Sequence, residues 1–314
     1  MSKDRNFIEF ERECFSLPAD YLSNSSNILF FYLDLRSDET IQYFLDQFNF
    51  EICSRVLPIK EQIRIRNIRD DRLRITKLFN GILVRYLVAC FENSHSALSA
   101  IKITRGKFGK PAFFNRSNYS FNSSDEQSIL SVAICFHSDK PIGCDLSNPS
   151  DIAKFDIENL RDFYKHEFSD IFTDNEVTEL DRMFRKECYA NRNSQLQILS
   201  QYWAIKESLS KMSGYGLNFG LKRYEVLGMK RPAELIMPEN KLQHQSLFEC
   251  LGQLALKPIG EQISGVRNVC FTIPDSKLIC SVVGAYNLVK IIKVDAEGIS
   301  EFIKSISCKN TNAS

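Results

Sequence analysis

The sequence predicts an α+β fold built as two similar lobes. Both halves of the 314-residue chain mix amphipathic helical stretches with short apolar strands, and 44% of the residues are hydrophobic, enough for a sizeable core. We expect a loosely ordered N-terminus at 1–26, an N-terminal α+β lobe at 27–139 and a C-terminal α+β lobe at 140–314. Because both lobes lie in one chain, we expect a monomer.

The N-terminal lobe begins with a buried strand at 28–35, where ILFFYLDL is rich in strand-forming residues. A charged helical stretch at about 57–74 continues as an apolar helix to Cys90. A strand with a glycine and proline turn follows at 101–114. The continuous apolar run at 128–136 predicts a fully buried strand.

The C-terminal lobe opens with a strand at 142–147, followed by mixed-charge helical sequence at about 152–192. One long helix then ends at Gly214. Three more strands are expected after it, at 223–229, 268–273 and 278–284, and the turn PDSK joins the last two.

The stretch WAIKESLSKMSGYGL at 203–217 carries the most informative pattern. At about 100° per residue one apolar stripe predicts its core-facing side. The stripe consists of Ile198, Tyr202, Ile205, Leu209 and Met212. Glu207 and Lys211 lie roughly opposite, after Trp203, the single tryptophan. A solvent-exposed Glu and Lys pair is one interpretation. The other is a carboxylate and an ammonium beside a Trp that another lobe covers, which suits a metal and phosphate site.

The glycines at 214 and 216 end this helix and let the backbone come close to a bound group. The whole pattern WxxKExxxKxxGxGL resembles the C-terminal signature of the 4'-phosphopantetheinyl transferases of the surfactin-synthetase-activating type. FGKP at 108–111 resembles the GKP turn of that family, and PIGCDLS at 141–147 resembles its IGxDxE strand. Order and coarse spacing also match, so the resemblance covers about 57–217.

The resemblance implies a pseudo-twofold protein that binds coenzyme A and magnesium between its lobes. Such enzymes transfer the 4'-phosphopantetheine arm of coenzyme A to a serine of an apo carrier protein and release adenosine 3',5'-bisphosphate. Asp145 and Glu207 would be magnesium ligands, and Glu207, or a water it orients, would take the serine proton. Lys211, a second catalytic residue, and Lys110 would neutralise phosphate oxygens, with Pro111 beside them in the GKP turn.

Two positions depart from the family pattern. Ser147 stands where the family has a second carboxylate, and Asp125 stands where it has a histidine. The strand DLSNP is similar to that of the lysine-pathway members, which also lack an acid there, so the resemblance points to the fungal branch that activates α-aminoadipate reductase. We hypothesise that Glu126 supplies the missing metal ligand; the alternative is a solvated loop acid.

A basic run at 60–77 has two interpretations. The resemblance implies that it holds the 3'-phosphate of coenzyme A, with Lys60 as the first choice and Arg74 or Lys77 as further candidates. Alternatively it marks a nucleic-acid or acidic-partner binding module. Interruption by acidic residues and the lack of an aromatic platform argue against nucleic acid. A third possibility is a scaffold that keeps the transferase fold and has lost turnover.

Composition sets the remaining expectations. The net charge of +1 gives no general sign of nucleic-acid or membrane partners. The ten cysteines lack metal-type or redox-type spacing, so we expect reduced thiols and a cytoplasmic location. The charged N-terminus does not resemble a signal peptide, and the longest apolar stretch is too short to span a bilayer.

Overall fold

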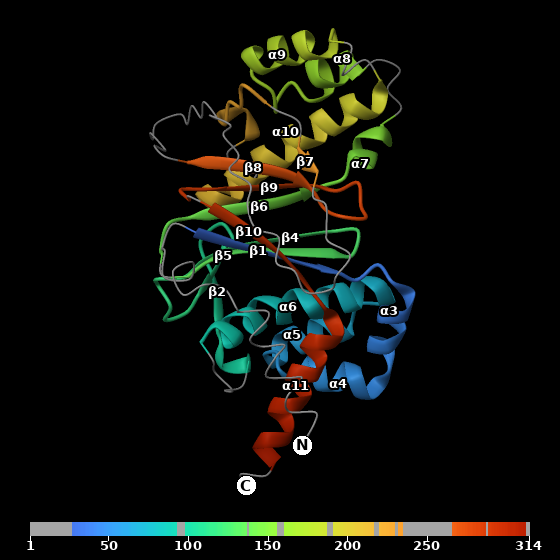
Figure 1. The fold of residues 1–314 in the computed structure, drawn as a ribbon, viewed down its shortest axis with the longest axis vertical. Coiled ribbons are helices and arrows are strands. Elements are labelled where there is room, and N and C mark those ends of the chain that lie inside the picture. Colours follow the sequence, from blue (N-terminus) through green and yellow to red (C-terminus); the bar gives the residue numbers. More distant parts are fainter. Residues whose placement is uncertain are drawn as a thin grey trace.

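The computed structural model describes residues 27–92, 98–136, 138–155, 160–186, 191–216, 220–229, 232–234, 266–286 and 288–311 (Figure 1). The N-terminus at 1–26 and most of 230–265 lie outside the described residues. Figure 1 shows four layers, in which two β-sheets lie between two groups of helices. The predicted α+β class is confirmed by this mixture of elements.

The first sheet has the strand order β10-β1-β5-β4. Its strands are β1 (Asn27–Asp34), β4 (Ser120–Glu126), β5 (Ile129–Cys135) and β10 (Leu288–Val294). β1 pairs in parallel with β10 and antiparallel with β5, which pairs antiparallel with β4. Both faces of β1 are covered, so every side chain from Ile28 to Leu33 is buried. This explains why the predicted strands at 28–35 and 128–136 are continuously apolar.

Helices cover the lower face of the first sheet in Figure 1. They are α3 (Asp38–Leu45), α4 (Gln47–Arg55), α5 (Ile59–Arg66), α6 (Asp71–Phe91) and α11 (Ala296–Thr311). The expected helical stretch at 57–90 divides at Asp70, whose carboxylate accepts the amide of Leu73 at 2.7 Å and caps α6. Neither α6 nor any other described helix combines the length and apolar character needed to cross a membrane.

The second sheet has the order β6-β9-β8-β7, with β6 (Ile142–Ser147), β9 (Ile279–Gly284), β8 (Arg267–Thr272) and β7 (Ala233–Glu234). The predicted hairpin of β8 and β9 is confirmed. At its turn, the amide of Ile273 donates to the carbonyl of Leu278 at 3.0 Å, and Asp275 has a φ of 54°. Helix α10 (Arg192–Ser213) lies on the outer face of this sheet.

The inner faces of the two sheets share one core. It joins alternate residues of β1 and β5 to residues of β6, β8 and β9. Phe30 and Phe271 meet edge to face across the interface, with ring centroids 5.1 Å apart. The edge strands β4 and β6 lie side by side, although they belong to different sheets. The fold thereby brings the first sheet next to the strand that carries Asp145.

A small two-stranded sheet stands beside the first sheet. It contains β2 (Ile103–Arg105) and β3 (Pro111–Phe113), and it follows the short 3-10 helix η1 (Leu98–Ala100). The turn closes through the amide of Gly106 on the carbonyl of Lys110 at 2.9 Å, and Gly109 takes a φ of 84°. The predicted glycine and proline turn at 101–114 is therefore confirmed.

Further helices pack against α10, at the top of Figure 1. They are α7 (Pro149–Ala153), α8 (Leu160–Asp162), the π-helix η2 (Phe163–Glu167) and α9 (Asp174–Phe184). The strand expected at 223–229 is wrong. After the 3-10 turn η5 (Leu221–Arg223) this segment is a loop, because side chains bind its backbone: Lys206 donates to the Tyr224 carbonyl, and Glu176 accepts the Val226 amide.

The last two elements return to the first sheet. β10 pairs with β1, and α11 packs with α4 in the lower helical layer. By chain order they fall within 140–314, yet their partners fall within 27–139. Long-range pairing of this kind leaves no local signal in the sequence.

Candidate active site

Helix α10 supports the candidate site. Asn191 caps its start, and Gly214, in the left-handed conformation with a φ of 79°, ends it as predicted. The predicted stripe of Ile198, Tyr202, Ile205, Leu209 and Met212 is buried, with no member more than 3% exposed. Leu217, the last residue of the motif, lies outside the described residues.

Trp203 packs against an aromatic side chain from the C-terminal half of the chain. It is half-buried and meets Phe168 edge to face, with ring centroids 5.7 Å apart. Phe168 directly follows η2 and packs against the apolar cluster around α10. The indole therefore helps hold this part of the chain to α10.

Lys211 and Asp145 form a close ion pair. Lys211 Nζ donates to Asp145 Oδ1 at 2.7 Å and to Ser124 Oγ at 3.1 Å, and Ser124 Oγ donates to Asp145 Oδ1 at 2.9 Å. Burial raises the pKa of Asp145, and the Lys211 charge opposes that rise. Burial would lower the pKa of Lys211, but the Asp145 charge raises it overall, so the ammonium stays charged.

The negative charge of Asp145 affects the pKa values of Glu207 and Glu126. Burial and the Asp145 charge raise the pKa of Glu207 above the ordinary value. Burial, with the charges of Asp151, Asp145 and Asp125, raises the pKa of Glu126. The three predicted metal-binding carboxylates therefore interact electrostatically, although no three His, Cys, Asp or Glu side chains in the described residues form a ready metal cluster.

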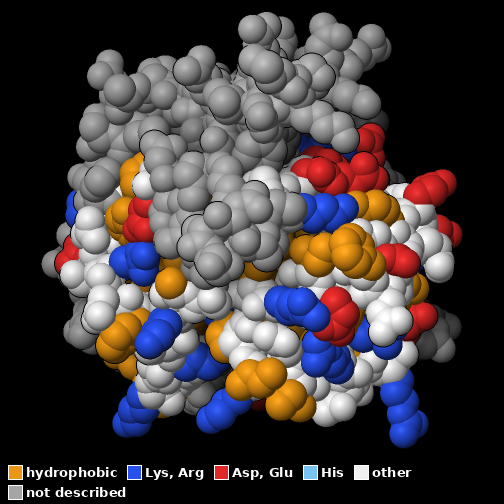
Figure 2. Space-filling view, turned by 90° about the horizontal axis from the view of Figure 1, so that it is seen from below, with side chains coloured by type: hydrophobic (Ala, Val, Ile, Leu, Met, Phe, Trp, Pro, Cys, Tyr) orange, Lys and Arg blue, Asp and Glu red, His pale blue; other side chains and the backbone are white. Residues whose placement is uncertain are grey.

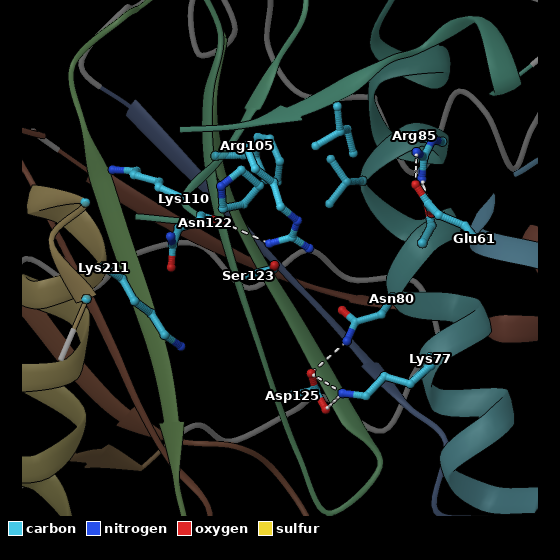
Figure 3. A pocket seen from close by; sticks show the side chains of 18 of the residues that line it. Glu61, Lys77, Asn80, Arg85, Arg105, Lys110, Asn122, Ser123, Asp125 and Lys211 are labelled. Carbon is cyan, nitrogen blue, oxygen red and sulfur yellow. Dashed lines mark hydrogen bonds and ion pairs between the residues drawn. The ribbon is translucent and has the colours of Figure 1, made fainter. Parts of the chain in front are cut away.

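A cavity of about 700 Å³ opens beside this ion pair (Figure 3). It lies between α5, α6, the β2–β3 hairpin, β4 and the end of α10. Its basic lining side chains are Arg64, Lys77, Arg85, Arg105, Lys110 and Lys211. Gly214 and Gly216 also line it, so the backbone after α10 is open to a bound molecule, as predicted. Its basic lining suits an anionic ligand.

Lys110 and Pro111 of the GKP turn line the cavity. Lys110 Nζ donates to the carbonyl of Met212 at 2.6 Å, at the C-terminal end of α10, where backbone carbonyls favour a cation. Burial lowers the pKa of Lys110 to about 8. Pro111 begins β3 and lines the cavity. The GKP turn thus brings one ammonium to the end of the helix that carries Lys211.

Asp125, at the position of the family histidine, also lines the cavity. Its carboxylate accepts Lys77 Nζ at 2.8 Å and Asn80 Nδ2 at 2.7 Å (Figure 3). Lys77 therefore offsets the negative charge of Asp125 at the wall of the cavity. Among the predicted 3'-phosphate residues, Lys77 is the one that reaches the cavity.

Lys60 and Arg74 do not line the cavity. Lys60 is exposed on α5, and Arg74 pairs with Asp71 and lies over the Phe50 ring. Arg64 and Arg105 line it instead. Arg64 belongs to the basic run at 60–77 but was not singled out, and Arg105 was not predicted. One helical turn separates Lys60 from Arg64, and without the register of α5 the sequence cannot tell which faces inward. Arg105 stands just before the GKP turn, which is the signal that would have identified it.

Ser147 does not replace the missing carboxylate. Its hydroxyl lies 2.6 Å from Ser200 Oγ, in a buried contact between β6 and α10. The side chain therefore joins strand to helix, and a metal site here would depend on Asp145, Glu207 and a third group.

A buried ion pair fixes the helix just before Glu207. Lys206 and Glu176 are fully buried, and Lys206 Nζ lies 2.9 Å from Glu176. Lys206 also donates to the carbonyls of Leu221 and Tyr224, while Glu176 completes the capping box of α9. The lysine of the WxxKE motif thus joins α9, α10 and the following loop.

The basic run at 60–77 is not a continuous positive surface. Arg66, Arg72 and Arg74 pair with Glu51, Asp38 and Asp71. Figure 2, which views the helical side of the molecule, shows acidic and apolar side chains among the basic ones. These pairs do not favour the nucleic-acid interpretation, because the arginines already have partners.

Comparison with known proteins supports the resemblance seen in the sequence. Residues 141–253 match the model of the 4'-phosphopantetheinyl transferase superfamily. This match confirms the resemblance predicted from the motifs of the sequence.

Two curated relatives carry a more particular name. The L-aminoadipate-semialdehyde dehydrogenase-phosphopantetheinyl transferase of Candida glabrata is 27% identical over 194 residues, which cover 61% of this chain and 68% of the relative. The protein of that name from Saccharomyces cerevisiae is 25% identical over 180 residues, which cover 56% of this chain and 60% of the relative.

Proposed function

We propose that this protein transfers the 4'-phosphopantetheine arm of coenzyme A to a serine of an apo carrier protein. The observation that carries the proposal is the contact of Lys211 with Asp145 beside Glu207, at the edge of a basic cavity of about 700 Å³. The superfamily match supports the reaction class. The names of the fungal relatives support the carrier domain of α-aminoadipate reductase as the acceptor.

In the proposed reaction the serine oxygen of the carrier forms a bond to the β-phosphorus of coenzyme A. The phosphorus–oxygen bond to the adenosine 3',5'-bisphosphate leaving group breaks, and its electron pair leaves with that group. Glu207 takes the serine proton, directly or through one water. Burial and the Asp145 charge raise the pKa of Glu207, which makes its carboxylate a better base than an ordinary one.

The basic side chains have separate roles. Lys211 and Lys110 neutralise phosphate oxygens as point charges, from the two sides of the end of α10. Arg64, Arg105 and Lys77 are the candidates for the 3'-phosphate, because each lines the cavity. Positioning and charge neutralisation are what phosphoryl-type transfer requires.

The residues fit a magnesium ion. Mg²⁺ is commonly bound by one or two carboxylates together with substrate phosphates. Asp145 supplies a buried carboxylate and Glu207 a partly buried one, whose pKa is raised by burial and by the Asp145 charge. We assign the ion to Asp145 and Glu207, with Glu126 as a third ligand. When bound, it would neutralise the negative charge of the diphosphate during transfer.

We also propose that the protein consists of two similar lobes related by a pseudo-twofold axis, with the boundary near residue 140. This arrangement is supported by two four-stranded sheets, each covered by one long helix, α6 or α10. The first lobe also takes β10 and α11 from the end of the chain. The protein would act as a monomer in the cytoplasm, in line with the dispersed cysteines of the sequence.

Product release tests the reaction. The protein, coenzyme A, magnesium and an apo carrier domain should release adenosine 3',5'-bisphosphate, measured by liquid chromatography. A carrier domain whose acceptor serine is alanine should release none. Release that does not depend on the serine would indicate hydrolysis and contradict the transfer.

A further inference from the structure

Two edge strands of different sheets are joined by side chains at the candidate site. Asn122 and Ser124 occupy alternate positions of β4, and they accept the amides of Cys144 and Leu146, at alternate positions of β6. The distances are 3.0 Å to Asn122 Oδ1 and 3.2 Å to Ser124 Oγ. On the edge of β6 that faces away from β9, backbone amides therefore donate hydrogen bonds to side-chain oxygens of β4.

The hydroxyl of Ser124 is fully used. A hydroxyl offers one donor and two acceptor positions. Ser124 Oγ donates to Asp145 Oδ1 and accepts from the Leu146 amide and from Lys211 Nζ. It therefore contacts three groups at once: the carboxylate, the ammonium and the strand that carries the carboxylate.

This geometry determines how Asp145 is oriented. Both side-chain contacts of the carboxylate are made by Oδ1, one from Ser124 and one from Lys211. Asp145 is 5% exposed, so water has little access to replace a lost hydroxyl. An alanine at 124 would leave the buried Leu146 amide without its acceptor and the carboxylate of Asp145 held by Lys211 alone.

We propose that Ser124 is a positioning residue that orients Asp145 and Lys211 for the metal and diphosphate of coenzyme A. The inference rests on the proposed function, since it concerns the same site. Ser124 acts through Asp145 and Lys211. Outer-shell partners of metal ligands affect metal affinity because they fix the orientation of the ligands.

Binding of Mn²⁺ in the presence of coenzyme A tests this role. Electron paramagnetic resonance measures free Mn²⁺ with the full chain and with the variants Ser124→Ala, Ser124→Thr and Ser120→Ala. Ser120 is a matched control, because it lies on the same strand and its buried hydroxyl has no hydrogen-bond partner within the described residues. Thermal melting of each variant monitors folding.

We expect Ser124→Ala to weaken Mn²⁺ binding by about tenfold or more. Ser124→Thr keeps the hydroxyl and should stay within about threefold of the wild type, and Ser120→Ala should bind as the wild type. Wild-type affinity in Ser124→Ala, or equal losses in the alanine and threonine variants, would overturn the positioning role alone. A wild-type protein that binds neither Mn²⁺ nor coenzyme A would instead contradict the proposed function.

A second substitution keeps the test decisive if the alanine variant does not fold. Ser124→Cys preserves the shape of the side chain but supplies only a weak donor and acceptor. Mn²⁺ binding that is weaker in Ser124→Cys than in Ser124→Thr supports the proposal. Equal, wild-type binding in both would overturn it.

Discussion

Gly143 of β6 lies directly against the carbonyl of Ser208 in α10. A Cβ atom built on Gly143 would lie 1.9 Å from the Ser208 oxygen and 2.8 Å from the Met212 amide nitrogen. These are backbone atoms of the helix, so the contact has no side chain that can move away. The absence of a side chain at 143 lets α10 pack close to β6, and this close packing brings Lys211 to Asp145.

Gly143→Ala should therefore destabilise the fold and separate the two charged residues. Overpacking against backbone costs about 1–3 kcal/mol or more in the free energy of unfolding. Urea denaturation measures this, with Gly106→Ala as the control, because a Cβ there would lie 3.7 Å from its nearest contact. Equal stabilities of the two variants would contradict the account of β6 and α10 packing.

The buried pair of Lys206 and Glu176 should be essential for stability. Lys206→Met leaves the carboxylate of Glu176 buried without its cation, which costs about 3–5 kcal/mol. Lys165→Met is the surface comparison, because Lys165 and Asp181 are partly exposed and such pairs contribute about 0–1 kcal/mol. The free energy of unfolding in urea should separate the variants. A loss below 1 kcal/mol for Lys206→Met would refute the role of this pair, since it is about the surface value.

Coenzyme A affinity should fall as the pH rises above about 8. Burial lowers the pKa of Lys110 to about 8, so its ammonium is charged below that pH and loses its proton above it. The loss removes attraction for phosphate, by at most about tenfold per pH unit. Lys211 stays charged because its pKa is raised. Calorimetry between pH 7 and 9.5 should show this decline in the wild type and a flatter profile in Lys110→Met; parallel profiles would exclude Lys110 as its source.

Glu126→Gln tests the third metal ligand. Removing the charge should raise the magnesium concentration for half-maximal activity, by about tenfold if Glu126 contacts the ion or orients a ligand. Glu126 is close enough to Asp151, Asp145 and Asp125 for their negative charges to help raise its pKa. An unchanged magnesium dependence would show that Glu126 is only a loop acid.

The local elements were predictable where one periodicity dominates. The stripe of α10 and the continuous apolar runs of β1 and β5 follow from burial on one or both faces. The loop after Arg223 was not predictable. Its residue types favour a strand, but its backbone binds the side chains of Glu176 and Lys206. These partners lie about 50 and 20 residues earlier in the chain, and the sequence alone does not reveal such contacts.

The motif residues of the candidate site were predictable, whereas the basic residues that line the rest of the cavity were predicted only in part. The motifs predicted Asp145, Glu207, Lys211 and Lys110, and all four lie near the end of α10 or beside it. Lys60 and Arg74 were predicted for the coenzyme and do not line the cavity. The direction of a basic side chain on α5 or α6 depends on how the helix packs, and basic residues recur every two to four positions of the run, so every face of the helix offers a candidate.

The role of Ser124 was hidden for a different reason. It depends on β4 and β6 lying side by side although they belong to different sheets. A strand pattern indicates which side chains share a face and leaves open which strand of another sheet they meet.

The most direct measurement is the intact mass of an apo carrier domain of α-aminoadipate reductase after incubation with this protein, coenzyme A and magnesium. A parallel reaction contains Glu207→Ala, which removes the proposed proton acceptor and metal ligand. We predict a mass gain of one phosphopantetheine arm with the wild type and none with the variant. No gain with the wild type, or an equal gain with Glu207→Ala, would contradict the proposed transferase site.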